Sequence, residues 1–217
     1  MSQPLPTATR TPERPAGSDP RPLLQRAADQ AVGLVGAVRP GEQDLPTPCT
    51  DYDVRALCGH VLTVLRRIEL VARGGSPFDV PQVVRDVPDA DLSRAAAADR
   101  DRMVATWADD AVLDRVLTLP WGTLPGRAAA LAYAQELTVH AWDLATATGR
   151  GAVLDPGLAA AVLPLARQFV PAEPRGGPVP FGPVVDFPGE DAGEDAGDAY
   201  AELVAWLGRD PWWQPRG

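Results

Sequence analysis

The chain has 217 residues, 45% of them hydrophobic, which fits one globular domain with tails or one domain with a small appendage. The formal net charge is −9, and no stripe of basic residues interrupts this acidity, so a nucleic-acid-binding role is not expected. There is no apolar run long enough to span a membrane, and the N-terminus lacks the apolar core of a secretory signal. We therefore expect a cytoplasmic protein.

The first half of the chain predicts a tail and two helices. Residues 1–20 are rich in proline and arginine and are expected to be a disordered tail. Apolar residues then recur at three- and four-residue steps from Arg21 up to Pro40-Gly41, as in an amphipathic helix. The pattern Thr50-x-x-Asp53 resembles a capping box and predicts the start of a second helix, which ends near Gly74-Gly75.

The second half predicts three more helices before residue 171. A charged, alanine-rich third helix covers 89–109, and a fourth covers 127–148, with Gly149 as its stop. Apolar residues come close to alternating over 113–126, which predicts either a short hairpin or an extended loop. A fifth helix follows over 157–170.

These elements predict an all-α fold, a helical bundle with short additional helices, and four regions. After the tail at 1–20, the bundle occupies 21–172, and an acidic, proline- and glycine-rich linker occupies 173–198. Residues 199–217 are expected to form a short helix and a tail that pack on the bundle, because the paired Trp212 and Trp213 would be costly to expose.

The chain has two histidines, and their positions predict a metal site. Glu136 and His140 are four residues apart on the fourth helix, so they project from the same face with Cβ atoms about 5–6 Å apart. His60 falls at the edge of the apolar stripe of the second helix. Two imidazoles and one carboxylate from facing helices suit zinc, nickel or iron(II), and they leave a coordination position open. The alternative is that His140 is bonded to Glu136 or Asp143 and that His60 is unrelated to both.

Several residues near His60, Glu136 and His140 have two possible interpretations each. Asp143 either orients His140 from behind or is an exposed aspartate with a local contact. Arg55, Arg66 and Arg67 either bind an anionic substrate near His60 or lie on a solvated helix face.

Cysteines and aromatic residues favour structural interpretations. Cys49 and Cys58 are expected to be buried small hydrophobes rather than a disulfide, although a ligand or nucleophile role stays open. Tyr133 and Trp142 are expected to be packing aromatics, and Trp121-Gly122 a hairpin turn rather than a cover over a pocket.

Two longer motifs add a resemblance to a family. Residues 46–57 read PTPCTDYDVRAL and lead to His60, and residues 136–149 read ELTVHAWDLATATG. Both resemble segments of actinobacterial DinB-like proteins, which belong with the N-terminal domain of mycothiol-dependent maleylpyruvate isomerase. The resemblance implies a DinB-like four-helix bundle that binds a divalent metal, commonly zinc, through His60, Glu136 and His140. Tyr52 stands where the family usually has tryptophan, and an acidic linker with one short helix replaces the isomerase's folded C-terminal domain.

Three hypotheses for the function follow. The first is a metal-dependent transferase or isomerase that uses a low-molecular-weight thiol, such as mycothiol, and an electrophilic substrate. The second is a metal-binding regulatory or stress-response module without turnover. The third is a purely structural helical protein in which the three residues never meet. A homodimer through an exposed helix face is compatible with each of them.

Overall fold

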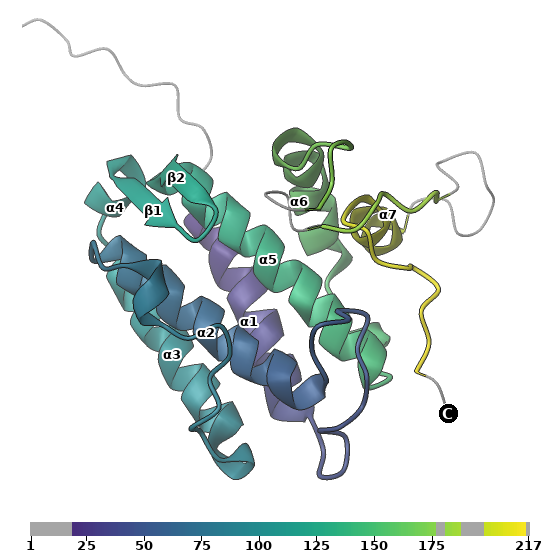
Figure 1. The fold of residues 1–217 in the computed structure, drawn as a ribbon. Coiled ribbons are helices and arrows are strands. Elements are labelled where there is room, and N and C mark those ends of the chain that lie inside the picture. Colours follow the sequence, from purple (N-terminus) through teal and green to yellow (C-terminus); the bar gives the residue numbers. More distant parts are fainter. Residues whose placement is uncertain (1–18, 177–180, 188–197, 216–217) are drawn as a thin grey trace, which may run out of the picture.

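The computed structural model describes residues 19–176, 181–187 and 198–215. Within these ranges four long helices form a bundle (Figure 1). They are α1 (Arg21–Ala37), α2 (Val54–Ala72), α3 (Leu92–Trp107) and α5 (Gly126–Ala147). The predicted all-α bundle is confirmed, and its helices lie within a few residues of the expected bounds.

Shorter elements connect and extend the bundle. A four-residue helix, α4 (Ala111–Asp114), leads into an antiparallel hairpin of β1 (Val116–Leu119) and β2 (Gly122–Pro125). Its register pairs Val116 with Pro125 and Leu119 with Gly122, so the alternating apolar pattern at 113–126 is a hairpin and not an extended loop. Single 3₁₀ turns are η1 (Pro77–Asp79), η2 (Asp89–Asp91) and η3 (Gly151–Val153).

Helix α5 is the centre of the molecule. It packs against α1, α2 and α6, and apolar or small residues cover most of its circumference. A helix that is apolar on nearly every side is suited to burial within a bundle rather than to a surface position. Because Glu136 and His140 lie on this helix, they are held by a largely buried element of the fold.

The start of α2 differs in detail from the predicted capping box. Asp53, not Thr50, is the N-cap, and its side chain accepts a hydrogen bond from the Ala56 amide at 2.7 Å. The helix therefore begins at Val54, because an aspartate directly before the first turn satisfies an otherwise unpaired helical amide.

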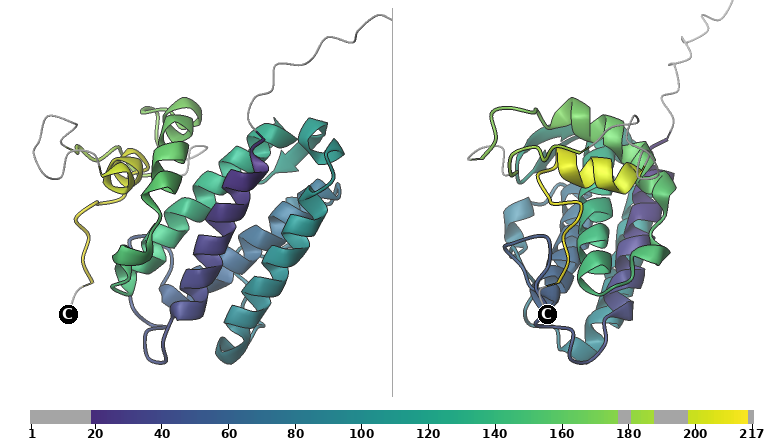
Figure 2. Two further views of the ribbon diagram at one scale, coloured as in Figure 1. Left: turned by 180° about the vertical axis from the view of Figure 1, so that it is seen from behind. Right: turned by 90° about the vertical axis from the view of Figure 1, so that its right-hand side faces the viewer.

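Two further helices lie to one side of the bundle (Figures 1 and 2). Helix α6 (Pro156–Phe169) packs on α5, and α7 (Ala199–Trp206) packs mainly on α6. In the segment after α7, Trp213 packs partly against the core, whereas Trp212 is exposed and its ring contacts Phe187.

Parts of the expected tail and linker fall outside the described residues. These are residues 1–18 of the tail at 1–20, residues 177–180 and 188–197 of the linker at 173–198, and the last two residues of the segment 199–217.

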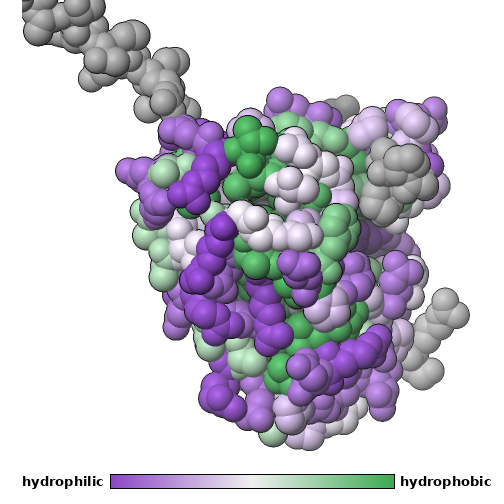
Figure 3. Space-filling model, turned by 60° about the vertical axis from the view of Figure 1, so that its left-hand side comes forward, coloured by the Kyte–Doolittle hydropathy of each residue, from purple (hydrophilic) through white to green (hydrophobic). Residues whose placement is uncertain are grey.

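The surface carries both hydrophobic and hydrophilic side chains. On the face drawn in Figure 3, apolar areas are interrupted by hydrophilic side chains. Among the helices of the described ranges, none combines the length and the apolar character needed to cross a bilayer.

Candidate metal centre

The structure brings the three predicted residues together. His60 extends from α2, and Glu136 and His140 extend from α5, with one potential ligand atom from each lying within 4.8 Å of the others. The two imidazole rings meet nearly at right angles, with their centroids 4.9 Å apart. All three residues are buried or half-buried, and His60 is more enclosed than its predicted position at the edge of the apolar stripe.

The spacing between His60 and Glu136 fits two ligands of one ion better than a direct hydrogen bond. His60 Nε2 lies 3.6 Å from Glu136 Oε1, which is longer than an ordinary N–H···O bond. Two ligands at zinc bond lengths of 2.0–2.2 Å and a tetrahedral angle would be separated by about 3.4 Å. The other carboxylate oxygen, Glu136 Oε2, is buried and has no hydrogen-bond partner among the described residues.

The orientation of His60 is fixed by a backbone carbonyl. His60 Nδ1 lies 2.8 Å from the carbonyl oxygen of Gln82, and because a carbonyl only accepts, Nδ1 carries the proton. This leaves the lone pair on Nε2, which is the nitrogen that faces Glu136. The Tyr52 ring stacks on the imidazole with the two ring centroids 5.0 Å apart, so the tyrosine has an aromatic packing role.

Gly59 allows the loop that carries Gln82 to approach α2. The Val84 amide donates to the Gly59 carbonyl at 3.2 Å, and a Cβ at position 59 would lie only 2.3 Å from the Val84 carbonyl oxygen. Any larger residue would push the loop away from the helix. The glycine next to His60 thus permits the contact that orients His60.

His140 is oriented from behind by a buried carboxylate. Its Nδ1 donates to Asp143 Oδ2 at 3.0 Å, which leaves Nε2 free on the side of His60 and Glu136. Asp143 is fully buried, so the alternative of an exposed aspartate is wrong. Burial would raise the pKa of Asp143, but the charge of Arg209 and the hydrogen bonds from His140 and Arg209 hold that pKa below its ordinary value. Burial lowers the pKa of His140, which favours the neutral imidazole that a metal ion requires.

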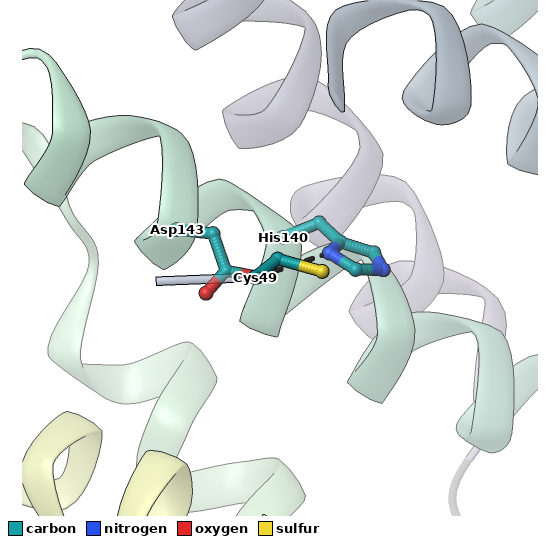
Figure 4. A group of neighbouring side chains, drawn as sticks. All are labelled: Cys49, His140 and Asp143. Carbon is teal, nitrogen blue, oxygen red and sulfur yellow. Dashed lines mark hydrogen bonds and ion pairs between the residues drawn. The ribbon is translucent and has the colours of Figure 1, made fainter. Parts of the chain in front are cut away.

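A second group of potential ligands lies behind His140. One potential ligand atom each from Cys49, His140 and Asp143 also lies within 4.8 Å of the others. Figure 4 shows these three side chains side by side. This group would use His140 Nδ1, which already donates to Asp143, and both Asp143 oxygens accept hydrogen bonds from Arg209. The geometry therefore favours the group with free donor atoms, which is that of His60, Glu136 and His140.

Both cysteines are free, as expected. Cys58 is buried in the hydrophobic core, and Cys49 is half-buried beside His140. Burial raises the pKa of Cys58 to about 12, and burial together with the charge of Asp143 raises the pKa of Cys49 to about 11.

The three arginines of α2 have different surroundings. Arg55 forms an ion pair with Asp89, and Arg66 Nε donates to Asp99 at 2.8 Å. Arg67 is only 6% exposed, so its expected position on a solvated face is wrong. The loop around η1 covers it and accepts its hydrogen bonds, a burial that the helical period of α2 alone does not reveal.

Sequence reasoning also missed one feature of Tyr133. Its side chain is buried as a packing aromatic would be, and the Trp121 ring contacts it edge-on at 5.4 Å. The hydroxyl, however, is buried with no hydrogen-bond partner in the described part of the chain. Buried tyrosine hydroxyls usually have a partner, so this group requires an explanation beyond packing.

A pocket opens in the surface close to the site. Its lining includes Tyr52, which stacks on His60, and Trp213 from the segment after α7. The remaining lining residues belong to the segment 44–53, which contributes three aspartates.

Fold and site together define a helical-bundle protein with a candidate metal cluster of two histidines and one glutamate. The sequence profile of the family described as mycothiol maleylpyruvate isomerase N-terminal domain matches residues 24–145, which is more than half of the chain. The chain belongs to this family, as its two motifs predicted.

The chain is also similar to proteins of known sequence and structure. An uncharacterized protein of Mycobacterium tuberculosis, found in two strains, is 31% identical over 191 residues, covering 88% of this chain and 98% of its own length. The crystal structure of the mycothiol-dependent maleylpyruvate isomerase superposes with a TM-score of 0.53 at 16% identity, covering 70% of this chain and 68% of that chain. A histidine-to-alanine mutant of that enzyme gives a TM-score of 0.51 at 14% identity over the same shares. At this level of identity the two structures confirm the fold.

Proposed function

We propose that the protein is a metal-dependent enzyme that uses a low-molecular-weight thiol of the mycothiol type as its nucleophile, in a transfer or an isomerisation reaction. The observation that carries the proposal is the arrangement of two oriented imidazoles and one carboxylate around a common point. Three protein ligands leave room for a fourth group, which is typical of catalytic rather than structural metal sites. Zinc suits this donor set best, and nickel or iron(II) are the alternatives.

The side chains of the site have separate tasks in this proposal. His60, Glu136 and His140 hold the ion, while the Gln82 carbonyl and Asp143 fix the two rings with Nε2 toward it. A divalent ion bound there would lower the pKa of a coordinated thiol, so that the thiol gives up its proton to solvent near neutral pH. The pocket beside Tyr52 offers space for the polar remainder of the thiol molecule.

The reaction balances without an oxidant or reductant. The sulfur lone pair forms a carbon–sulfur bond with the electrophile, and in a transfer the leaving group departs with its bonding electrons. In an isomerisation the sulfur adds to a conjugated carbon–carbon double bond, rotation follows about the resulting single bond, and elimination returns the thiol. The protein's own cysteines do not fit this task, because the pKa of Cys49 is about 11 and that of Cys58 is about 12.

The name of the structurally similar enzyme supports a thiol as the cosubstrate. That enzyme is described as mycothiol-dependent and as a maleylpyruvate isomerase. We propose that this chain also uses such a thiol as its cosubstrate. A panel of electrophiles then identifies the second substrate.

Turnover by metal-loaded protein tests the proposal. Purified protein is supplied with zinc, mycothiol and a panel of electrophiles, and the conjugates and isomers are measured by mass spectrometry. We expect turnover by the wild type that falls about 100-fold or more in Glu136→Gln, which keeps the shape of the side chain but weakens it as a ligand. Glu202→Gln is the matched control, because Glu202 lies on α7 and pairs with Arg167.

A lack of turnover would refute the proposal. If metal-loaded protein turns over none of the electrophiles, the enzyme proposal is wrong, and a metal-binding regulatory module becomes the better account.

A further inference from the structure

A buried arginine without an acidic partner lies on the same helix as His60. Arg67 Nε donates to the Pro77 carbonyl at 3.0 Å, and Nη2 donates to the Val80 carbonyl at 3.1 Å and to Gln82 Oε1 at 3.3 Å. All three acceptors are neutral, and no carboxylate of the described ranges forms an ion pair with this guanidinium. An enclosed charge of this kind is costly unless an opposite charge joins it.

The hydroxyl of Tyr133 is a second buried group without a partner among the described residues. Tyr133 is only 1% exposed, and its hydroxyl is one of two buried side-chain atoms without a partner among the described residues, the other being Glu136 Oε2. Burial raises the pKa of this hydroxyl, the charge of Glu136 raises it further and the charge of Arg67 lowers it, so both charges act on the same group. The hydroxyl therefore stays protonated and available as a hydrogen-bond donor.

Helix geometry places these two groups next to the candidate metal centre. Tyr133 precedes Glu136 by three residues on α5, which is about 5 Å along the helix axis. Gln82 links Arg67 to His60. Its side chain accepts a hydrogen bond from Arg67, and its backbone carbonyl accepts one from His60. A hydrogen-bond donor and a positive charge thus belong to residues that are linked to Glu136 and His60, one through α5 and the other through Gln82.

The Trp121 side chain packs against Tyr133 from the hairpin. Trp121 lies at the turn of the β1–β2 hairpin, is 48% exposed and contacts the Tyr133 ring edge-on. A partly exposed side chain on a short hairpin therefore packs directly against the buried Tyr133.

We propose that Arg67 and Tyr133 form an anion subsite beside the metal centre, and that the electrophilic substrate carries a carboxylate a few bonds from its reacting carbon. The carboxylate accepts a hydrogen bond from the Tyr133 hydroxyl and neutralises Arg67, which satisfies both buried groups at once. This inference rests on the proposed function for the identity of the substrate as an electrophile, but the subsite itself is tested by binding alone.

Calorimetric titration of zinc-loaded protein with succinate tests the subsite, with succinamide as the neutral counterpart of the same size. We expect succinate to bind and succinamide to bind at least about 10-fold more weakly, because a hydrogen bond to a charged group and an ion pair are both lost. In Tyr133→Phe, which removes only the hydroxyl, the Kd for succinate should rise about 10-fold. In Arg67→Met the Kd should rise by at least as much.

Tyr200→Phe is the matched control for Tyr133→Phe. Tyr200 is also buried, but its hydroxyl accepts a hydrogen bond from Gln30 at 2.8 Å on the α7 side of the molecule. Its removal should lower the unfolding midpoint and leave succinate binding unchanged, whereas Tyr133→Phe should leave the midpoint unchanged or raise it.

Two results would overturn the subsite. One is succinate binding by Tyr133→Phe and Arg67→Met within twofold of the wild type, and the other is wild-type protein that fails to prefer succinate over succinamide. Because neither measurement involves thiol turnover, succinate binding with no conjugation activity would refute the proposed function and keep the anion subsite.

Discussion

Arg209 holds Asp143 through two hydrogen bonds, with Nε donating to Oδ1 at 2.7 Å and Nη2 donating to Oδ2 at 2.9 Å. Asp143 in turn accepts from His140, so a residue after the last helix is linked to the candidate metal centre. The segment that follows α7 is therefore part of the support of the site and not only a covering of the bundle.

Loss of Arg209 should destabilise the fold. Arg209→Met leaves the fully buried Asp143 carboxylate with His140 as its one remaining side-chain partner in the described ranges, and breaking a buried pair typically costs about 3–5 kcal/mol. Chemical denaturation measures the free energy of unfolding. Arg167→Met is the control, because its pair with Glu202 is partly exposed and should contribute about 1 kcal/mol or less. Equal effects of the two substitutions would contradict the supporting role of Arg209.

Loss of the Asp143 carboxylate should weaken metal binding without removing a ligand. Asp143→Asn keeps the size of the side chain but no longer fixes the His140 ring with a charged acceptor, so zinc affinity should fall about 10–100-fold. Titration against a competing chelator measures this change. Asp155→Asn, at an exposed partner of Arg26, should bind zinc as the wild type does. Unchanged affinity in Asp143→Asn would show that His140 needs no such support.

An added methyl group at Gly59 should disturb His60 through the loop. Gly59→Ala places a Cβ against the Val84 carbonyl, and overpacking of this kind typically costs about 1–3 kcal/mol. Zinc affinity should fall as well, because the displaced loop carries the Gln82 carbonyl that orients His60. Gly33→Ala on α1 is the opposite case, since open space surrounds that position and the change should stabilise the helix by about 0.5–1 kcal/mol. A neutral or stabilising Gly59→Ala would contradict the account of the loop.

Neither cysteine should react readily in the folded, metal-free protein. The pKa is about 11 for Cys49 and about 12 for Cys58. At pH 8 roughly one thousandth of each thiol, or less, is therefore ionised. A disulfide reagent at pH 8 should therefore label them at least about 100-fold more slowly than it labels free glutathione, and unfolding in urea should restore the fast rate. Rapid labelling of one thiol in the folded state would contradict this prediction and would make Cys49 a candidate nucleophile.

The individual helices and the three candidate ligands could be predicted from the sequence because both depend on local patterns. Helical periodicity located the long helices, and the i,i+4 spacing of Glu136 and His140 with one further histidine gave the cluster. The contacts that orient the cluster are not local. Gln82 acts through its backbone carbonyl, which any residue type would supply, and Arg209 meets Asp143 across 66 positions of the chain.

The burial of side chains by loops is the second feature that the sequence does not reveal. Arg67 belongs to a helix face that looks solvated from its period, and only the path of the η1 loop encloses it. The sequence does not reveal that the Tyr133 hydroxyl lacks a hydrogen-bond partner, because the residue type is the same whether or not a partner is present. Arg209 likewise follows Asp143 by 66 positions, so no local pattern links the two side chains.

Metal content tests the central claim most directly. Wild-type protein, His60→Ala, His140→Ala and the control Asp155→Asn are loaded with zinc, dialysed and measured by inductively coupled plasma mass spectrometry. We predict about one zinc ion per chain for the wild type and the control, and a small fraction of that for each histidine variant, since each loses one of three ligands. No bound metal in replete wild-type protein, or equal metal in all four proteins, would contradict the metal centre.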